Sequence, residues 1–125
     1  DLLNAFGKAV YLESEPFIDV VTAISGSGPA YVFYFVEVLS EIGLNQGLSK
    51  KNAKSLAIET IIGSAKLLEM SNINPKILKE NVTSPGGTTE AGLEILASED
   101  HGLYHLLDKT VSAAKKRAKG LNSNG

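Results

Sequence analysis

The sequence predicts an all-α domain of about five or six helices. Three observations support this fold class. Apolar residues recur at helical spacing through most of the 125 residues. Helix-start signals precede several of these stretches. Only residues 10–12 have the composition of a strand, and one strand cannot form a sheet alone.

The first sixteen residues differ from the rest. "LLNAFGKAVYLESE" suggests a short helix that stops at Gly7, followed by the strand. We interpret residues 1–16 as the tail of a preceding domain and residues 17–125 as the helical domain. Because the sequence does not start with methionine, we expect it to be part of a longer chain.

The stretch "VVTAISGSGPAYVF" imitates a dinucleotide-binding turn. That turn needs a small residue three positions after its second glycine, and here the residue is Tyr31. We therefore predict a plain helix start with Pro29 as the first helical residue. The helix, residues 29–44, is apolar on nearly every face, which indicates burial against a second copy of the chain. Gly43 and Gly47 mark a frayed end.

Three further helices follow from their start signals. Ser49 is a good N-cap for a helix over residues 50–71. Asn74 and Pro75 have the residue types of an N-cap and a first helical position, and predict a short helix through about Asn81. After Gly102, residues 103–121 form an amphipathic pattern with one apolar side.

The segment "TSPGGTTEAG" is the best candidate for a site. Gly86 and Gly87 let the backbone turn sharply and approach a ligand. Thr88 and Thr89 then open a helix, whose unpaired N–H groups and dipole favour a carboxylate or phosphate. Ser84 and Thr89 add hydroxyl groups.

A simpler interpretation of this segment is a connection between two helices with a threonine cap. On residue types alone this interpretation is favoured. In either case Glu90 is an ordinary first-turn acid that stabilises the helix.

Several functional classes receive no support. Twelve basic and fourteen acidic residues give a net charge of -2, so no nucleic-acid partner is expected. The longest apolar window contains Glu37 and Glu41 and is too short to span a membrane. Without cysteines or a signal peptide, we expect a cytoplasmic protein. His101 and His105 lack a third ligand in a recognised pattern, so no metal site is predicted.

Two motifs together carry a family resemblance. "SGSGPAY" (residues 25–31) is followed some fifty residues later by "NVTSPGGTTEAGL" (residues 81–93). This pair closely resembles the C-terminal domain of pyrroline-5-carboxylate reductase, from about Phe17 to Lys119. The resemblance implies an interlocked helical dimerisation domain, preceded by a remnant of an α/β dinucleotide-binding domain. It also implies a homodimer, which can assemble into a decamer in the full-length protein.

The resemblance implies a function as well. The family reduces 1-pyrroline-5-carboxylate to L-proline with NADPH or NADH, which is bound mainly by an N-terminal domain that this sequence does not contain. The Thr89 hydroxyl matches the family threonine that meets the ring nitrogen, and Asn81 and Val82 match positions near the nicotinamide. The residues assigned to the substrate are Ser84, Gly86, Gly87, Thr88 and Thr89, with the N–H groups of the last three holding its carboxylate.

Two other hypotheses remain open. One is a non-catalytic helical self-association module, which would have no need of the glycine-rich segment from Ser84 to Thr89, here called the anion cradle. The other is a different member of the wider imine or 6-phosphogluconate dehydrogenase-like group, which should not share both motifs. Under the leading hypothesis, the chain alone is expected to be inactive.

Overall fold

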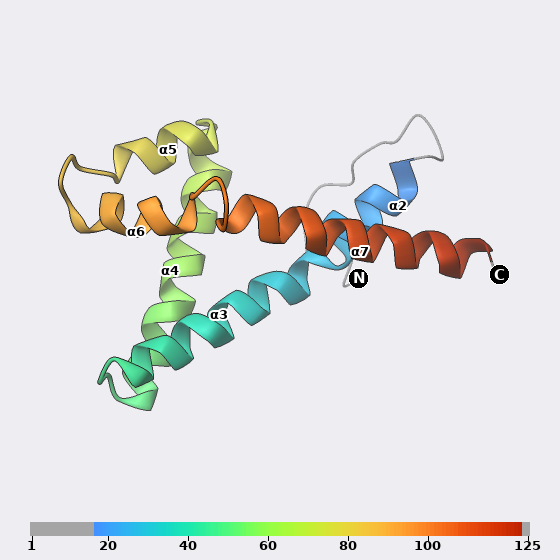
Figure 1. Ribbon diagram of the computed structural model, residues 1–125. Coiled ribbons are helices and arrows are strands. Elements are labelled where there is room, and N and C mark those ends of the chain that lie inside the picture. Colours follow the sequence, from blue (N-terminus) through green and yellow to red (C-terminus); the bar gives the residue numbers. More distant parts are fainter. Residues whose placement is uncertain (1–16, 124–125) are drawn as a thin grey trace. The chain divides into compact units, whose positions relative to one another are not determined.

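The computed structural model describes residues 17–123, which form six α-helices and one π-helix without a strand among them (Figure 1). The all-α prediction is confirmed. The predicted domain remnant at residues 1–16, with its strand, lies outside the described residues. The elements are α2 (Ile18–Val21), η2 (Thr22–Gly26), α3 (Gly28–Asn45), α4 (Lys50–Ser71), α5 (Pro75–Asn81), α6 (Thr88–Leu96) and α7 (Leu103–Ser123).

The chain falls into two compact units. One unit, Phe33–Leu103, contains most of α3 and all of α4, α5 and α6. The other consists, among the described residues, of 17–32 and 104–123, and so contains α2, η2, the start of α3 and nearly all of α7.

In the first unit, α3 ends in a well-formed cap. Gly47 has a φ of 104°, in the left-handed region that favours glycine. Its N–H donates to the Leu44 carbonyl at 3.0 Å, and the Leu48 N–H donates to the Gly43 carbonyl at 3.1 Å. These two bonds define a Schellman motif. The expectation of a frayed end was therefore wrong, and Gly43 lies inside the helix.

Small residues let α3 and α4 approach closely. A Cβ atom on Gly43 would lie only 3.2 Å from the Ala53 Cβ. Ala53 and Ala57 are both buried on α4. The predicted N-cap of α4 is confirmed, because the Ser49 hydroxyl accepts a hydrogen bond from the Asn52 N–H at 3.2 Å.

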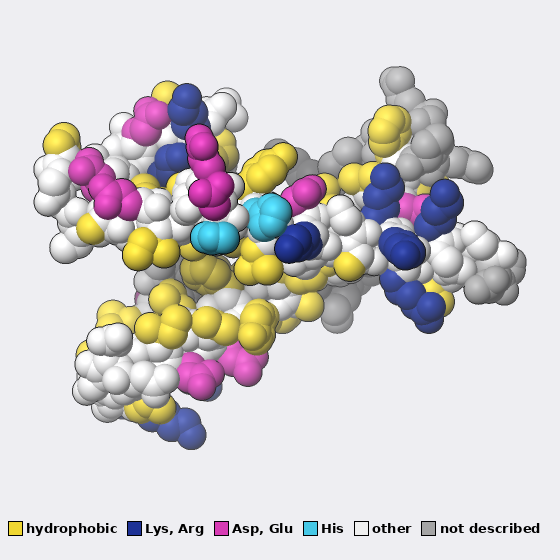
Figure 2. Space-filling view, viewed as in Figure 1, with side chains coloured by type: hydrophobic (Ala, Val, Ile, Leu, Met, Phe, Trp, Pro, Cys, Tyr) yellow, Lys and Arg dark blue, Asp and Glu magenta, His cyan; other side chains and the backbone are white. Residues whose placement is uncertain are grey.

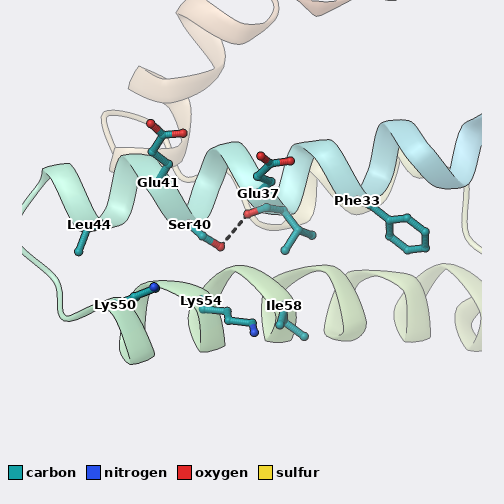
Figure 3. A pocket seen from close by; sticks show the side chains of 9 residues that line it. Phe33, Glu37, Ser40, Glu41, Leu44, Lys50, Lys54 and Ile58 are labelled. Atoms are coloured by element: carbon teal, nitrogen blue, oxygen red, sulfur yellow. Dashed lines mark hydrogen bonds between the residues drawn. The ribbon is translucent and has the colours of Figure 1, made fainter.

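An open groove of about 410 Å³ runs between α3 and α4 (Figure 3). Phe33 and Leu44 lie on the side of α3 that faces α4, whereas the carboxylates of Glu37 and Glu41 point away from it. The Ser40 hydroxyl donates to a backbone carbonyl of its own helix at 2.7 Å, so it offers no free donor to the groove. The remaining lining residues are Val36, Lys50, Lys54 and Ile58.

The short helix α5 begins and ends as predicted. The Asn74 side chain accepts a hydrogen bond from the Lys76 N–H at 2.9 Å, and Pro75 is the first helical residue. The preceding helix α4 is ended by Asn72, which adopts the left-handed conformation with a φ of 54°. Together these residues end α4 and start α5 within a few positions.

In the second unit, the glycine-rich "SGSG" stretch begins inside a π-helical turn, of which Ser25 and Gly26 are the last two residues. The Ser27 N–H donates to the Thr22 carbonyl at 2.9 Å, five residues earlier, and Ala23 is fully buried. A helix thus precedes the turn where a dinucleotide fingerprint needs a strand, which confirms that this is not such a site. Pro29 is the second residue of α3 rather than the first, because Gly28 already belongs to the helix. A hydrogen bond of 2.9 Å joins the Asn122 amide to the Asp19 carboxylate and links α7 to α2.

The buried apolar residues are small. Among the described residues the buried hydrophobic side chains are all alanines, and no large one is fully buried. Large apolar side chains lie on the surface instead, as the yellow areas of Figure 2 show. On α3, Phe33 is 63% and Phe35 42% exposed. None of the helices in the described part combines the length and the apolar character that a membrane crossing requires.

Candidate functional site

The candidate site begins where α5 ends. Asn81 is the last residue of α5 and Val82 its C-cap. Thr83 stabilises the C-terminal end of α5, because its hydroxyl donates to the Lys79 carbonyl at 2.6 Å and its N–H donates to the Glu80 carbonyl at 3.0 Å. Asn81 is exposed and Val82 is 64% exposed, so both side chains are accessible to a ligand beside the loop that follows.

Residues Ser84–Gly87 form a tight β-turn. The Gly87 N–H donates to the Ser84 carbonyl at 3.0 Å and closes the turn. Gly86 has a φ of 70°, which a side chain would strain. A proline at the second position and a left-handed glycine at the third are the residue types of a type II turn. The sequence "SPGG" therefore dictates this local conformation.

Gly87 joins the turn to α6. It is the N-cap of α6 with an extended backbone, and no side chain caps the helix there. A Cβ atom on Gly87 would lie 3.1 Å from the Ser84 carbonyl oxygen, so the close approach depends on glycine. The alternative of a threonine cap is wrong, because Thr88 and Thr89 are already the first two residues of the helix.

The backbone N–H groups at this helix start divide into two kinds. Those of Thr88 and Thr89 find no acceptor within the described residues, as expected for the first turn of a helix. The Gly87 N–H is different, because it is used to close the turn. The Gly87 N–H is therefore not a free donor in this structure, unlike those of Thr88 and Thr89. Ser84, Thr88 and Thr89 are all exposed, so their hydroxyl groups are accessible beside the two free donors.

Glu90 has a role that the sequence did not predict. Its carboxylate accepts a hydrogen bond from the Gly86 N–H at 3.3 Å. A glutamate at the third helical position commonly reaches back to backbone N–H groups before the helix. Here it reaches one residue beyond the N-cap and holds the turn against α6. The capping-box spacing was the signal that could have identified it.

This arrangement is suited to binding a small anion. It offers free N–H donors, those of Thr88 and Thr89 among them, at the positive end of the helix dipole, with hydroxyl groups from Ser84 and Thr89 nearby. Its uncharged groups can orient a carboxylate and donate or accept hydrogen bonds. The chemistry within reach of these residues is therefore positioning of a ligand rather than nucleophilic attack.

The two histidines do not share a helix. α7 begins at Leu103, so His101 lies in the preceding turn and only His105 is helical. In residues 17–123 there is no group of three His, Asp or Glu side chains that could hold a metal ion.

Comparison with known proteins decides the family. Residues 15–121 match the family described as pyrroline-5-carboxylate reductase dimerisation. The chain belongs to this family. The match includes the whole candidate site and all of α2 to α6.

Curated relatives agree with the family match. The chain is 39% identical over 96% of its length to pyrroline-5-carboxylate reductase from Pseudomonas aeruginosa, and 41% identical over 98% to that from Arabidopsis thaliana. It covers 43% and 44% of these two proteins. The chain thus spans about two fifths of the length of the curated relatives it matches.

Solved structures of the family have the same fold. The structure of the reductase from Coxiella burnetii matches with a TM-score of 0.85 and 39% identity, covering 92% of this chain and 42% of that one. The Plasmodium falciparum reductase, solved with NADP bound, matches with a TM-score of 0.78 and 38% identity, covering 86% of this chain and 40% of that one.

Proposed function

We propose that the chain is the dimerisation and substrate-binding part of a pyrroline-5-carboxylate reductase, which reduces 1-pyrroline-5-carboxylate to L-proline with NADPH or NADH. The observation that carries the proposal is the pair of free N–H groups at Thr88 and Thr89, beside the Ser84–Gly87 turn. The family match over residues 15–121 and the curated relatives support the reaction.

The substrate carboxylate binds at the start of α6 in this proposal. The N–H groups of Thr88 and Thr89 donate to it, and the Ser84 hydroxyl supplies a further donor. Gly86 and Gly87 contribute through the backbone conformation of the turn rather than through their own N–H groups, because that of Gly87 donates to the Ser84 carbonyl and that of Gly86 to the Glu90 carboxylate. Fixing the carboxylate orients the ring and its C=N bond.

Thr89 is the residue proposed to act on the reacting group. Its hydroxyl meets the ring nitrogen, which carries a proton in the activated imine. Hydride adds to the imine carbon, and the C=N double bond becomes the C–N single bond of proline. No strong general base is needed, which agrees with the uncharged groups of the cradle. The side chain of Thr89 is exposed and so accessible to a ligand.

The nicotinamide cofactor supplies the hydride when it is bound. The residues that fit its reactive end are Asn81 and Val82, because both are exposed at the end of α5 directly before the cradle. Val82 offers apolar surface to a ring and Asn81 a hydrogen-bonding amide. The rest of the cofactor is held by the N-terminal dinucleotide-binding domain. The Plasmodium falciparum relative with NADP bound supports nicotinamide cofactor use.

We propose that the partner of the helical domain is a second copy of the chain. The groove between α3 and α4 has the apolar lining of an interface, with Phe33, Leu44 and Ile58 in it. Burying each such side chain contributes roughly 1.5–3 kcal/mol, and the single chain leaves Phe33 and Leu44 exposed and Ile58 partly exposed. The dimerisation description of the family supports this partner. Assembly to a decamer and a cytoplasmic location stay predictions.

A titration with L-proline, the product of the proposed reaction, tests the carboxylate site. Amide signals of the 125-residue chain are followed by NMR as L-proline is added. We expect the largest shifts at Thr88 and Thr89, and matched shifts with acetate but not with pyrrolidine, which lacks the carboxylate. A folded dimer that shows no shift near α6 would instead favour a self-association module without a catalytic contribution.

A further inference from the structure

Glu90 lies at the proposed site but has no part in the proposed reaction. It is partly buried at the third position of α6, and it accepts the Gly86 N–H at 3.3 Å. Its negative charge would disfavour an anion beside it, so its presence in a carboxylate cradle needs a reason. The hydrogen bond supplies one.

The Ser84–Gly87 turn has few attachments of its own. Its internal bond runs from the Gly87 N–H to the Ser84 carbonyl, and Gly86 is held at a φ of 70°. A glycine in that position gains much conformational freedom if the turn opens. The Glu90 carboxylate accepts a hydrogen bond from the N–H of Gly86 and so joins this glycine to the first turn of α6. The spacing between the Ser84 hydroxyl and the free N–H groups is thereby fixed.

We propose that Glu90 is a positioning residue, which holds the left-handed Gly86 in place so that Ser84 and the start of α6 form one carboxylate-binding cradle. The proposal rests on the proposed function, because it assigns the cradle to the substrate carboxylate. It makes a separate claim, however: Glu90 supports the cradle through its hydrogen-bond acceptor and not through its charge. By occupying the Gly86 N–H, Glu90 also removes that group from the donors available to the ligand.

Two substitutions separate the acceptor from the charge. Glu90→Gln keeps an oxygen that can accept the Gly86 N–H and removes the charge, whereas Glu90→Ala removes both. Glu94→Ala, one turn further along α6 and exposed, is the matched control. All are made in the 125-residue chain and studied by NMR. Hydrogen exchange of the Gly86 amide is one readout, and the shifts of the Thr88 and Thr89 amides on adding L-proline are the other.

We expect Glu90→Ala to exchange the Gly86 amide faster and to bind L-proline about fivefold more weakly, the factor that one ordinary hydrogen bond is worth. Glu90→Gln should retain the protection and bind at least as tightly as the parent chain, since it loses only a repulsive charge. Glu94→Ala should match the parent chain. Rescue by Gln would not be expected if Glu90 only stabilised α6 through its charge at the helix start.

Two results overturn the proposal. If Glu90→Ala keeps both the exchange protection of the Gly86 amide and the affinity of the parent chain for L-proline, Glu90 has no role in the cradle. Glu90→Gln that behaves like Glu90→Ala would show that the charge acts, not the acceptor. Failure of the proposed function is distinguishable from both, because the parent chain would then show no L-proline shift at Thr88 and Thr89. If Glu90→Ala unfolds, the Glu90→Gln result still decides between acceptor and charge.

Discussion

Gly102 should be the position where adding one methyl group harms this domain most severely. It is buried in the turn that follows α6, and its N–H donates to the Ser98 carbonyl at 2.9 Å. A Cβ atom there would lie 2.3 Å from the Ser98 carbonyl oxygen and 2.8 Å from that of Leu96. Both contacts are with backbone atoms, so no side-chain rotation can relieve them. Gly102→Ala must therefore displace the backbone of this turn.

The expected cost follows from these contacts. Overpacking of this kind costs about 1–3 kcal/mol, and the hydrogen bond to Ser98 contributes about another 1 kcal/mol if it breaks. We therefore expect Gly102→Ala to lose about 2–4 kcal/mol of stability. At about 4 °C per kcal/mol for a chain of this size, Tm should fall by roughly 8–16 °C.

Thermal unfolding followed by circular dichroism measures this effect at one fixed protein concentration. Gly63→Ala is the matched control, because Gly63 lies inside α4 and a Cβ atom there meets nothing within 4 Å. The control should gain about 0.5–1 kcal/mol from reduced backbone entropy of the unfolded chain. Equal melting temperatures for Gly102→Ala and the parent would refute the close packing of this turn.

Three further predictions concern catalysis, assembly and capping. In a full-length reductase that carries this domain, Thr89→Ala should lower kcat about tenfold or more while KM changes little. Thr89→Ser keeps the hydroxyl and should recover much of the activity. Normal turnover of Thr89→Ala in steady-state kinetics would exclude Thr89 from the mechanism. Sedimentation at micromolar concentration should find a dimer, and a stable folded monomer would contradict the assignment of the α3–α4 groove. Asn74→Ala should lose about 0.5–2 kcal/mol in urea unfolding, because the N-cap bond to Lys76 disappears; unchanged stability would show that this cap contributes little.

The sequence predicted those features that depend on short stretches of chain. Ser49 and Asn74 accept hydrogen bonds from residues three and two positions later, so residue type alone indicates where α4 and α5 begin. The "SPGG" turn is equally local, because proline and glycine restrict or permit particular backbone angles. These signals placed the start of α6 and the turn before it correctly on the chain.

What the sequence missed depends on how backbone groups compete for partners. The N–H of Gly87 looked free because it precedes a helix, but the closed turn uses it. The reach of Glu90 to Gly86 depends on the left-handed angle of that glycine, which a list of residue types does not give. The π-helical turn before Ser27 is a further case, since α- and π-helical hydrogen bonds differ by one residue in the choice of acceptor.

The small size of the buried apolar residues links the folding of this chain to its concentration. Alanines such as Ala23, Ala53 and Ala57 contribute little apolar area each, so burial within one copy gives little free energy to offset the loss of chain entropy. If a second copy covers the exposed apolar side chains, association and folding become one bimolecular equilibrium. Each tenfold dilution then removes about 1.4 kcal/mol from the dimer's stability. Dilution alone, without denaturant, should unfold this domain.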